Sequence, residues 1–390
     1  MILPPAILGL LGGGQLGRYF TLSARTMGYR VWVLDPDPDS PAGRLADRHL
    51  CARYDAPDAL AELAAHAVVV TCEFENVPAA SADWLAERVL LRPAPTALAV
   101  AQDRMIEKRF LEEAGVALAP WLPVEDAGAA ARVVPDWPFP AILKTARLGY
   151  DGKGQIPVAA VEDVPRVFRQ LGGVPCVLEQ RVDLDREVSV VLARGPDGRS
   201  RCFPVAENAH RGGILHLSRV PARVAASVRA QAEAVARHIA DRLEYCGVLA
   251  VEFFLTESGQ LLVNEIAPRP HNSGHYTLDA VTVSQFEQQV RAVCGLALVP
   301  VDLVAPVAML NLLGDLWPEN GGTPDFARLL SRGRVRLHLY GKPSARPGRK
   351  MGHVNVLGVP GEADASQPAR LAETLWAELR VPEAGSIADA

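Results

Sequence analysis

The chain has 390 residues, which is too long for one ordinary core and predicts two or three domains. Apolar residues make up 49% of it and charged residues 22%, a composition that excludes a disordered or collagen-like protein. Forty basic against forty-five acidic residues give a net charge of −5, so no long-range field attracts nucleic acid or anionic membranes. We therefore expect a globular protein with neither as a partner.

The six cysteines are scattered without a CxxC pair, which indicates free thiols in a reducing compartment. The apolar N-terminal run lacks basic residues before it and ends in glycines, so it predicts a first strand rather than a signal peptide. No run approaches the roughly 18 apolar residues of a membrane span. A cytoplasmic location is expected.

The opening pattern is a strand over residues 6–11, a glycine loop, a helix over 18–28 and a strand over 29–35, which together predict a βαβ unit. Further alternation of strands and helices follows, so the fold class is α/β. We expect four segments, with bounds 1–102, 103–182, 183–300 and 301–390.

Gly12, Gly13, Gly14 and Gly17 lie between the first strand and the first helix, where backbone N–H groups can approach an anion. The loop is therefore a candidate phosphate seat. Asp35 closes the next strand, where a dinucleotide-binding fold has its ribose acid, so NAD is one interpretation. A tight turn without a ligand is the alternative, because GGGQLG lacks the usual GxGxxG spacing.

The strongest hairpin signal surrounds the turn sequence ESGQ. A symmetric register there pairs Glu252 with Glu265 and places Leu261 and Val263 on the same face. Facing carboxylates among apolar neighbours repel each other, and a divalent cation such as Mg²⁺ removes the conflict. The alternative is that one acid is protonated or paired with Arg269.

Lys144 ends an apolar strand, and the glycine-rich loop LGYDGKGQ follows closely. A lysine on a strand can fix a nucleotide phosphate while such a loop closes over it, although a solvated lysine beside a surface turn is the alternative.

Glu179 and Glu187 flank a loop between strands, where acids accept hydrogen bonds from ribose hydroxyls or are merely solvated. PRPHNSGH and YGKPSARPGRK are rich in anion donors, and a solvated basic loop is the alternative for the second.

Taken in order from about residue 7 to residue 358, nine motifs resemble the N5-carboxyaminoimidazole ribonucleotide synthetase family of ATP-grasp enzymes. They are GGGQLG, CEFEN, QDR, ILKT, GYDGKGQ, LEQ, VEFF, NEIAPRPHNSGH and YGKPSARPGRKMGH. The resemblance implies an ATP-grasp fold with an N-terminal Rossmann-like domain, a small lid, a central domain with the hairpin, and a C-terminal segment that packs against the N-terminal domain. It also implies that ATP and bicarbonate, through carboxyphosphate, carboxylate the amine of 5-aminoimidazole ribonucleotide and release ADP and phosphate, in a homodimer.

Site residues follow from the same resemblance, motif by motif. The implied ATP site is Arg104, Lys144, Gly149, Tyr150, Asp151, Gly152, Lys153, Gly154, Gln155, Glu179, Gln180, Glu187, His210, Asn264 and Glu265. Glu179 and Gln180 are expected at the adenine and Glu187 at the ribose, while Glu252 and Glu265 are expected to hold one or two Mg²⁺ ions. The aminoimidazole nucleotide is expected to meet Gln15, Leu16, Glu73, Asn76, Lys342 and Arg349. The implied catalytic residues are Tyr150, Asp151, Lys153, Arg269, His271 and Asn272.

One position departs from the wider ATP-grasp group, in which an Asn often stands two residues after the second metal acid. Here that residue is Ala267. Strict alternation along a strand points Asn264 to the opposite face from Glu265, so we do not expect Asn264 to substitute. The group that takes the amine proton stays open among His271, Asp151 and phosphate.

Three other functions are compatible with parts of the sequence. A formate-dependent phosphoribosylglycinamide transformylase shares the acids and the lid. An NAD-dependent dehydrogenase is supported only by Asp35, and a non-catalytic nucleotide-binding regulator is the third.

Overall fold

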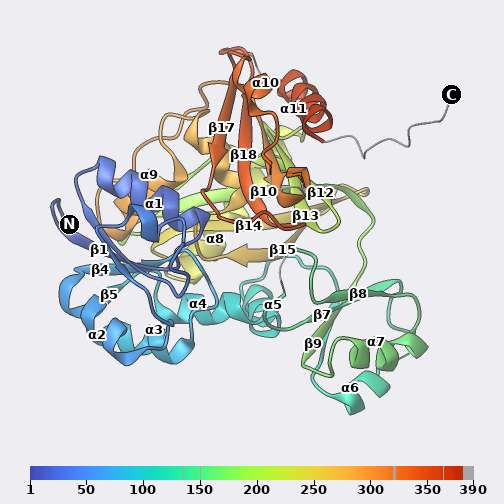
Figure 1. Cartoon of the computed structure of the whole chain (residues 1–390). Coiled ribbons are helices and arrows are strands. Elements are labelled where there is room, and N and C mark those ends of the chain that lie inside the picture. The colour runs from blue at the N-terminus through green and yellow to red at the C-terminus, as the bar shows by residue number, and fades with distance from the viewer. Residues whose placement is uncertain (135, 150, 319–321, 363, 381–390) are drawn as a thin grey trace.

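The computed structural model describes residues 1–134, 136–149, 151–318, 322–362 and 364–380. Two sheets and their helices form the main body, and a smaller lobe that carries β7, β8 and β9 extends from it (Figure 1). The connection between the body and this lobe runs past α5, which lies between them in the view of Figure 1.

The N-terminal part is a parallel sheet with strand order β3-β2-β1-β4-β5. Its elements are β1 (Ile7–Leu11), α1 (Gln15–Thr26), β2 (Arg30–Leu34), η1 (Gly43–Leu45), β3 (Arg48–Leu50), α2 (Pro57–His66), β4 (Val69–Cys72), α3 (Ala79–Ala86), β5 (Leu90–Leu91) and α4 (Pro95–Gln102). Leu8 of β1 pairs with Val31 and Val69, and all three are buried, as a parallel sheet covered on both faces requires. The predicted βαβ opening is confirmed.

The small lobe is an antiparallel sheet with order β6-β9-β7-β8. It follows α5 (Arg104–Glu113) and contains β6 (Trp121–Val124), α6 (Ala127–Ala131), β7 (Ala141–Thr145), β8 (Gln155–Val158), η2 (Val161–Asp163), α7 (Val164–Gln170) and β9 (Cys176–Gln180). Leu143 and Leu178 pack against α6 and α7, so the alternate residues Lys144 and Glu179 point to the other face. That alternation places both charged side chains at the cavity described below.

The rest of the described chain builds one large antiparallel sheet, in the order β15-β14-β10-β12-β13-β16-β18-β17 with β11 beside β10. Its elements are β10 (Leu184–Arg194), β11 (Ser200–Cys202), β12 (Ala206–Arg211), β13 (Ile214–Val220), α8 (Ala226–Arg242), β14 (Gly247–Thr256), β15 (Leu261–Ala267), η3 (Asn272–Leu278), α9 (Gln285–Val293), β16 (Val307–Leu313), η4 (Gly314–Leu316), α10 (Phe326–Leu330), β17 (Val335–Leu339), β18 (Lys350–Leu357) and α11 (Ser366–Leu379). β13 pairs with β16, so the segments expected at 183–300 and 301–390 share this sheet. The four-segment division remains a prediction.

The two faces of the large sheet differ in character. Val188 and Val190 of β10 pack with Ile239 of α8 in an apolar core, whereas the alternate residue Ser189 lies directly opposite Glu252 of β14. The first face is therefore core, whereas the second carries polar side chains toward the cavity next to another apolar cluster that contains Val191 and Val248. None of the described helices has the length and apolar character that crossing a bilayer requires, and all six cysteines are free thiols.

Candidate active site

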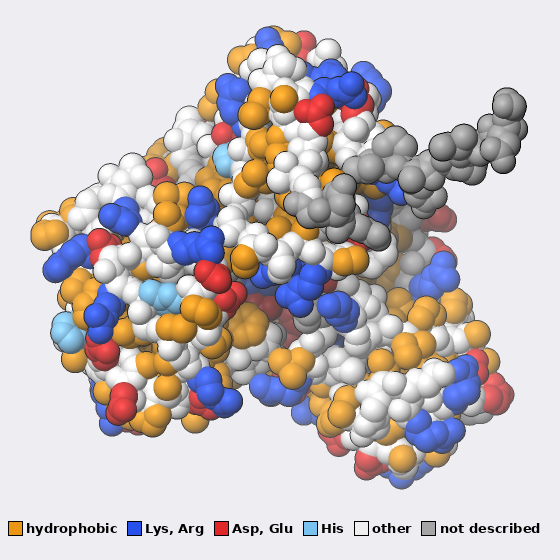
Figure 2. Space-filling view, in the orientation of Figure 1, with side chains coloured by type: hydrophobic (Ala, Val, Ile, Leu, Met, Phe, Trp, Pro, Cys, Tyr) orange, Lys and Arg blue, Asp and Glu red, His pale blue; other side chains and the backbone are white. Residues whose placement is uncertain are grey.

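A cavity of about 910 Å³ lies where the small lobe meets the body. Figure 2 shows the hollow, with Lys and Arg side chains gathered at its rim. The predicted site residues that line it are Gln15, Leu16, Glu73, Asn76, Arg104, Lys144, Gly149, Asp151, Gly152, Lys153, Gln155, Glu179, Gln180, Glu187, His210, Glu252, Asn264, Glu265, Arg269, His271 and Asn272. Gly154, Lys342 and Arg349 are not among its lining residues, and Tyr150 lies outside the described residues.

The two glutamates of the hairpin face each other as predicted, but for a different reason. Thr256 pairs with Gln260 at the turn, one residue away from the symmetric register, and a β-bulge at Asn264 restores the pairing of Glu252 with Glu265. The expectation that Leu261 and Val263 share the face of the glutamates is wrong, because both pack in the core on the opposite side.

The bulge also corrects the expectation for Asn264. A bulge places two residues against one on the partner strand and breaks the alternation of side chains, so Asn264 and Glu265 both line the cavity. Asn264 is therefore on the same side of the hairpin as the two carboxylates. No single-sequence periodicity locates such an extra residue.

Separate partners hold the two carboxylates. Arg104 Nη1 donates to Glu265 Oε2 at 2.8 Å, and His271 Nε2 lies 3.1 Å from Glu252 Oε1. Burial, followed by the charge of Glu265, raises the pKa of Glu252 to about 7, while Arg104 overcomes the effect of burial and lowers the pKa of Glu265. The alternative that Arg269 pairs with one of them is wrong, because Arg269 binds Glu75.

The donor set suits Mg²⁺ in combination with substrate phosphates. Within the described part of the chain, no group of three or more His, Cys, Asp and Glu side chains is arranged to hold a metal ion alone. Two facing carboxylates and an adjacent amide supply oxygen ligands only, and Mg²⁺ usually completes its shell with water and phosphate oxygens. Burial and then the charge of Glu265 raise the pKa of Glu252, and a divalent cation would relieve the repulsion between the two carboxylates.

Lys144 and Glu179 form a buried ion pair at 2.6 Å, and Lys108 contacts the second oxygen of the same carboxylate. The lysines outweigh the effect of burial and lower the pKa of Glu179 to about 2. Its carboxylate is thus engaged within the protein, and its expected contact with adenine remains a prediction. Lys108 is a residue that the sequence analysis missed.

Glu107 was missed as well. It is 3% exposed, accepts a hydrogen bond from the backbone N–H of Ile266 at 2.6 Å, and has a pKa that burial and Glu265 raise to about 8. Arg104, Glu107 and Lys108 have i, i+3 and i+4 spacing, so they share one face of α5. This spacing, in the helix that begins at the QDR motif, was the sequence signal from which Glu107 and Lys108 could have been found.

The glycine loop does not present free N–H groups to a phosphate. Gly14 N donates to Glu73 Oε1 at 2.5 Å and Gly17 N to Glu73 Oε2 at 2.9 Å, so a carboxylate of the chain occupies the start of α1. The prediction of a phosphate seat there is wrong for this structure. Whether Glu73 also contacts the nucleotide substrate stays a prediction.

Asp35 is likewise engaged within the protein. It accepts hydrogen bonds from Gly13 N and from the Tyr54 hydroxyl, both at 2.7 Å, and it is 8% exposed. A ribose hydroxyl would have to displace these donors. The geometry therefore counts against the NAD interpretation.

The basic C-terminal loop reaches the cavity through Lys350, and its Lys342 contacts one of the lining residues. Lys342 Nζ donates to Gln15 Oε1 at 2.9 Å and to the carbonyl oxygen of Lys350 at 2.7 Å, and Lys350 Nζ binds Asp151 at 2.6 Å. Lys350 lines the cavity although it was not among the predicted site residues. Arg349 donates instead to Ser344, on the loop itself.

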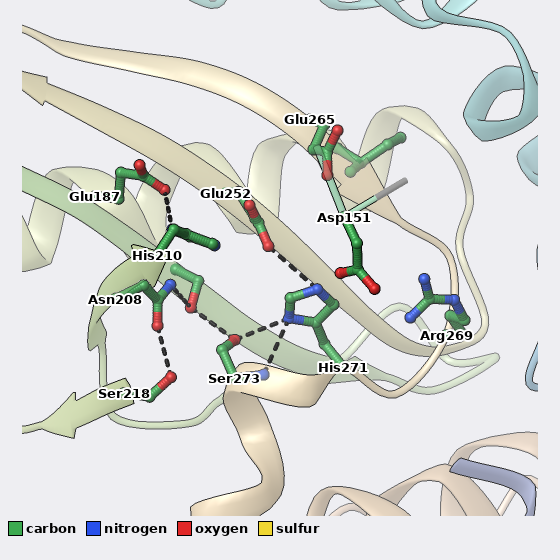
Figure 3. A network of polar contacts seen from close by, with 12 residues as sticks. Asp151, Glu187, Asn208, His210, Ser218, Glu252, Glu265, Arg269, His271 and Ser273 are labelled. Atoms are coloured by element: carbon green, nitrogen blue, oxygen red, sulfur yellow. Dashed lines mark hydrogen bonds and ion pairs between the residues drawn. The ribbon is translucent and has the colours of Figure 1, made fainter. Parts of the chain in front are cut away.

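The glycine-rich loop lies against the turn between β12 and β13. A Cβ on Gly213 would lie 2.6 Å from the Cα of Gly152, so only glycines permit this backbone contact. On the neighbouring strand, His210 Nδ1 lies 2.7 Å from Glu187 Oε2. In Figure 3, Asp151 from the loop, Glu265 and His271 converge on the same space.

Three family models match the chain in order. They are a ribonucleotide synthetase preATP-grasp domain over residues 6–102, an ATP-grasp domain over 109–286 and a phosphoribosylaminoimidazole carboxylase C-terminal domain over 307–365. An N5-carboxyaminoimidazole ribonucleotide synthase of Brucella melitensis is 44% identical over 353 residues, which cover 90% of this chain and 96% of that protein. The Bacillus subtilis protein of the same name is 42% identical, over 92% and 93% of the two chains. The chain belongs to the N5-carboxyaminoimidazole ribonucleotide synthetase family.

Solved structures agree with this assignment. An ADP complex of an N5-carboxyaminoimidazole ribonucleotide synthetase superposes with a TM-score of 0.90 at 40% identity, covering 98% of this chain and 99% of that one. An Aspergillus clavatus N5-carboxyaminoimidazole synthase in complex with ADP and 5-aminoimidazole ribonucleotide has a TM-score of 0.84 at 29% identity, covering 95% and 98%. The predicted family and ATP-grasp fold are confirmed, and the chain is an ATP-grasp ligase.

The buried cluster of Lys108, Lys144 and Glu179 yields a stability prediction. We expect Lys108→Met to lower the free energy of unfolding by about 3 kcal/mol, because it removes one of two cations that balance a buried carboxylate. The matched control is the neighbouring residue, Arg109→Met, whose pair with Glu125 is largely exposed, and we expect it to stay within about 0.5 kcal/mol of wild type. Urea unfolding measures both, and equal effects of the two substitutions would contradict the assignment.

Proposed function

We propose that the chain carboxylates the exocyclic amine of 5-aminoimidazole ribonucleotide, using ATP and bicarbonate and releasing ADP and phosphate, as a step of purine biosynthesis. The observation that carries the proposal is the facing pair of Glu252 and Glu265 in a cavity that the N-terminal part, the lid and the central sheet line together. Membership of the synthetase family, over nine-tenths of the chain, supports the same reaction.

We assign the ATP site to the lid side of the cavity. Lys144 is the cation for a phosphate, Glu187 and Gln180 are acceptors for ribose and adenine, and the backbone of the loop at residues 149–155 covers the triphosphate. Glu252 and Glu265, with Asn264 beside them, are the residues that would hold Mg²⁺, one ion or two. When bound, the ion would neutralise the phosphoryl group in transfer.

The aminoimidazole nucleotide is assigned to the opposite side of the cavity. Gln15, Leu16, Glu73 and Asn76 line that wall, and Lys342 is hydrogen-bonded to Gln15. Arg349 lies on the same C-terminal loop, where it adds positive charge near an incoming phosphate. The two substrates would then meet near Arg269, His271 and Asn272.

The chemistry explains why an enclosed cavity is needed. Bicarbonate is a poor electrophile, and its phosphorylation gives carboxyphosphate, which water destroys. Arg269 can hold the carboxylate of this intermediate, while Lys153 and Asp151 of the closing loop exclude water. An amine conjugated to imidazole then needs little beyond correct positioning.

The decisive assay is phosphate release from ATP with and without 5-aminoimidazole ribonucleotide. We expect release to need both the nucleotide and bicarbonate. Release triggered by formate with a glycinamide nucleotide would instead favour a transformylase, and ATP binding without any turnover would favour a regulator. The absence of a nicotinamide-dependent absorbance change would dispose of the dehydrogenase.

We further propose that the enzyme is a cytoplasmic homodimer. The support is the family resemblance alone. Light scattering on the purified protein tests the oligomeric state, and a monomer at micromolar concentration would contradict it.

The two glutamates should respond differently to removal of their charge. We expect Glu252→Gln and Glu265→Gln each to lower ATP turnover at least about 100-fold, since each deletes a charge that would hold the metal ion. In the absence of nucleotide, only Glu265→Gln should destabilise the protein, because it leaves Arg104 without its anionic partner. Glu252→Gln instead relieves the repulsion between the two glutamates. Turnover and thermal unfolding of both variants check this, and full turnover at saturating Mg²⁺ would refute the metal assignment.

Lys342 should matter for one substrate only. We expect Lys342→Ala to raise KM for the aminoimidazole nucleotide about 10- to 100-fold, the effect of losing one charge-assisted hydrogen bond. The KM for ATP should remain within about twofold of wild type, because Lys144 and the loop hold that substrate. Equal losses for both substrates in steady-state kinetics would show that the basic loop is misassigned.

A further inference from the structure

A chain of buried polar side chains runs through the large sheet to His271 at the cavity (Figure 3). Ser218 Oγ is 2.8 Å from Asn208 Oδ1, and Asn208 Nδ2 is 3.0 Å from Ser189 Oγ. Ser189 Oγ is 2.8 Å from Ser273 Oγ, which is 2.8 Å from His271 Nδ1. The chain ends where His271 Nε2 meets Glu252 Oε1 at 3.1 Å.

The backbone fixes which ring nitrogen of His271 carries the proton. Ser273 N–H points at His271 Nδ1 at 3.3 Å, and a backbone amide can only donate. Nδ1 must therefore accept, with its lone pair directed at Ser273. A ring whose Nδ1 is unprotonated is neutral and carries its single proton on Nε2, which faces Glu252 Oε1 at 3.1 Å.

The other hydrogen bonds of this network also run toward His271, each residue donating to the next one. Asn208 donates to Ser189, and Ser189 donates to Ser273, which leaves the Ser273 hydroxyl proton for His271 Nδ1. Ser218, Asn208, Ser189 and Ser273 are between 0% and 7% exposed, so water cannot replace a missing partner. Reversing one bond would leave a buried donor or acceptor unpaired, and the chain is therefore held in one orientation.

We propose that Asn208, Ser189 and Ser273 are positioning residues that hold His271 as a neutral Nε2–H donor directed at Glu252, and that His271 is not the base for the amine. Neither ring nitrogen offers a free lone pair, because Nε2 bears hydrogen and Nδ1 is engaged by Ser273. The second part of this inference rests on the proposed carboxylation. The first part concerns the protein alone and can be tested without any substrate.

The first experiment records proton–nitrogen correlation spectra of protein labelled with ¹⁵N-histidine, which distinguish protonated from unprotonated ring nitrogens. His271→Gln identifies the signals of His271 by their loss. We expect wild type to show a single neutral ring protonated at Nε2. A ring protonated at Nδ1, or a mixture of tautomers, would overturn the proposal.

The second experiment removes single hydrogen bonds from this series of polar side chains. Ser273→Ala and Ser189→Ala should allow the second tautomer to appear and should lower kcat about three- to tenfold, the cost of one hydrogen bond, with both KM values within about twofold. Ser189→Thr keeps the hydroxyl in a strand position that favours β-branched residues and should restore both readouts. Ser81→Ala, at a buried serine of α3, is the matched control and should change neither.

The outcomes separate positioning from mere packing. If the two alanine variants lose activity while His271 keeps a single tautomer, the hydrogen-bonded side chains act only structurally and the proposal fails. It also fails if tautomer and kcat are both unchanged. If Ser189→Ala does not fold, the wild-type and Ser273→Ala spectra decide. Failure of the phosphate-release assay would refute the carboxylation without affecting the tautomer.

Discussion

The repulsion between Glu252 and Glu265 is the constraint around which the cavity is organised. The two residues are opposite each other on β14 and β15, and each has a partner from a different part of the chain, His271 from the η3 region and Arg104 from α5. A pair of like charges so close together is stable only when other groups compensate it. The compensation therefore ties the large sheet, α5 and η3 together at one point.

Helix α5 contributes Arg104 to this compensation and makes two further buried contacts from the same face. Arg104 binds Glu265, Glu107 accepts from the backbone of Ile266, and Lys108 contacts Glu179 of the lid. Two of these contacts reach the hairpin and the third reaches β9. The helix therefore couples the lid sheet to the two glutamates that we expect to hold Mg²⁺. A shift of the lid by a few ångström would break a buried charge contact, which favours a defined lid position over a continuum of positions.

Much of the fold followed from local patterns in the sequence, whereas the set of site residues came from the resemblance to the family. The βαβ opening, the lid strand that carries Lys144 and the facing glutamates all come from alternation and turn residues. The bulge at Asn264 could not be predicted, since it compensates for a turn that lies one residue away from the symmetric choice. The pairing of the glutamates was thus correct although the register behind it was not.

Long-range pairing of charges was the second thing that patterns could not reveal. The glycine loop matched a phosphate seat by composition, yet Glu73, some sixty residues away, occupies its N–H groups. From the sequence alone, Lys108 would be placed on the exposed face of an amphipathic helix. The structure shows instead that Lys108 is 1% exposed, because β9 brings Glu179 beside it. Such contacts are decided by tertiary packing, on which single-sequence periodicity carries no information.

These internal pairs also bear on how the cavity would select its ligands. Lys144 binds Glu179, Arg269 binds Glu75 and Lys350 binds Asp151, so these three cations of the cavity already have anionic partners before a ligand binds to them. An incoming phosphate or carboxylate must therefore share or displace a carboxylate, and its net gain is the difference between two ion pairs. A ligand that engages only one cation gains little, whereas one with several anionic groups can engage Lys144, Arg269 and Lys350 together. The same arrangement thus makes occupancy depend on the number and spacing of the negative groups, as a site for a triphosphate and a ribonucleotide requires.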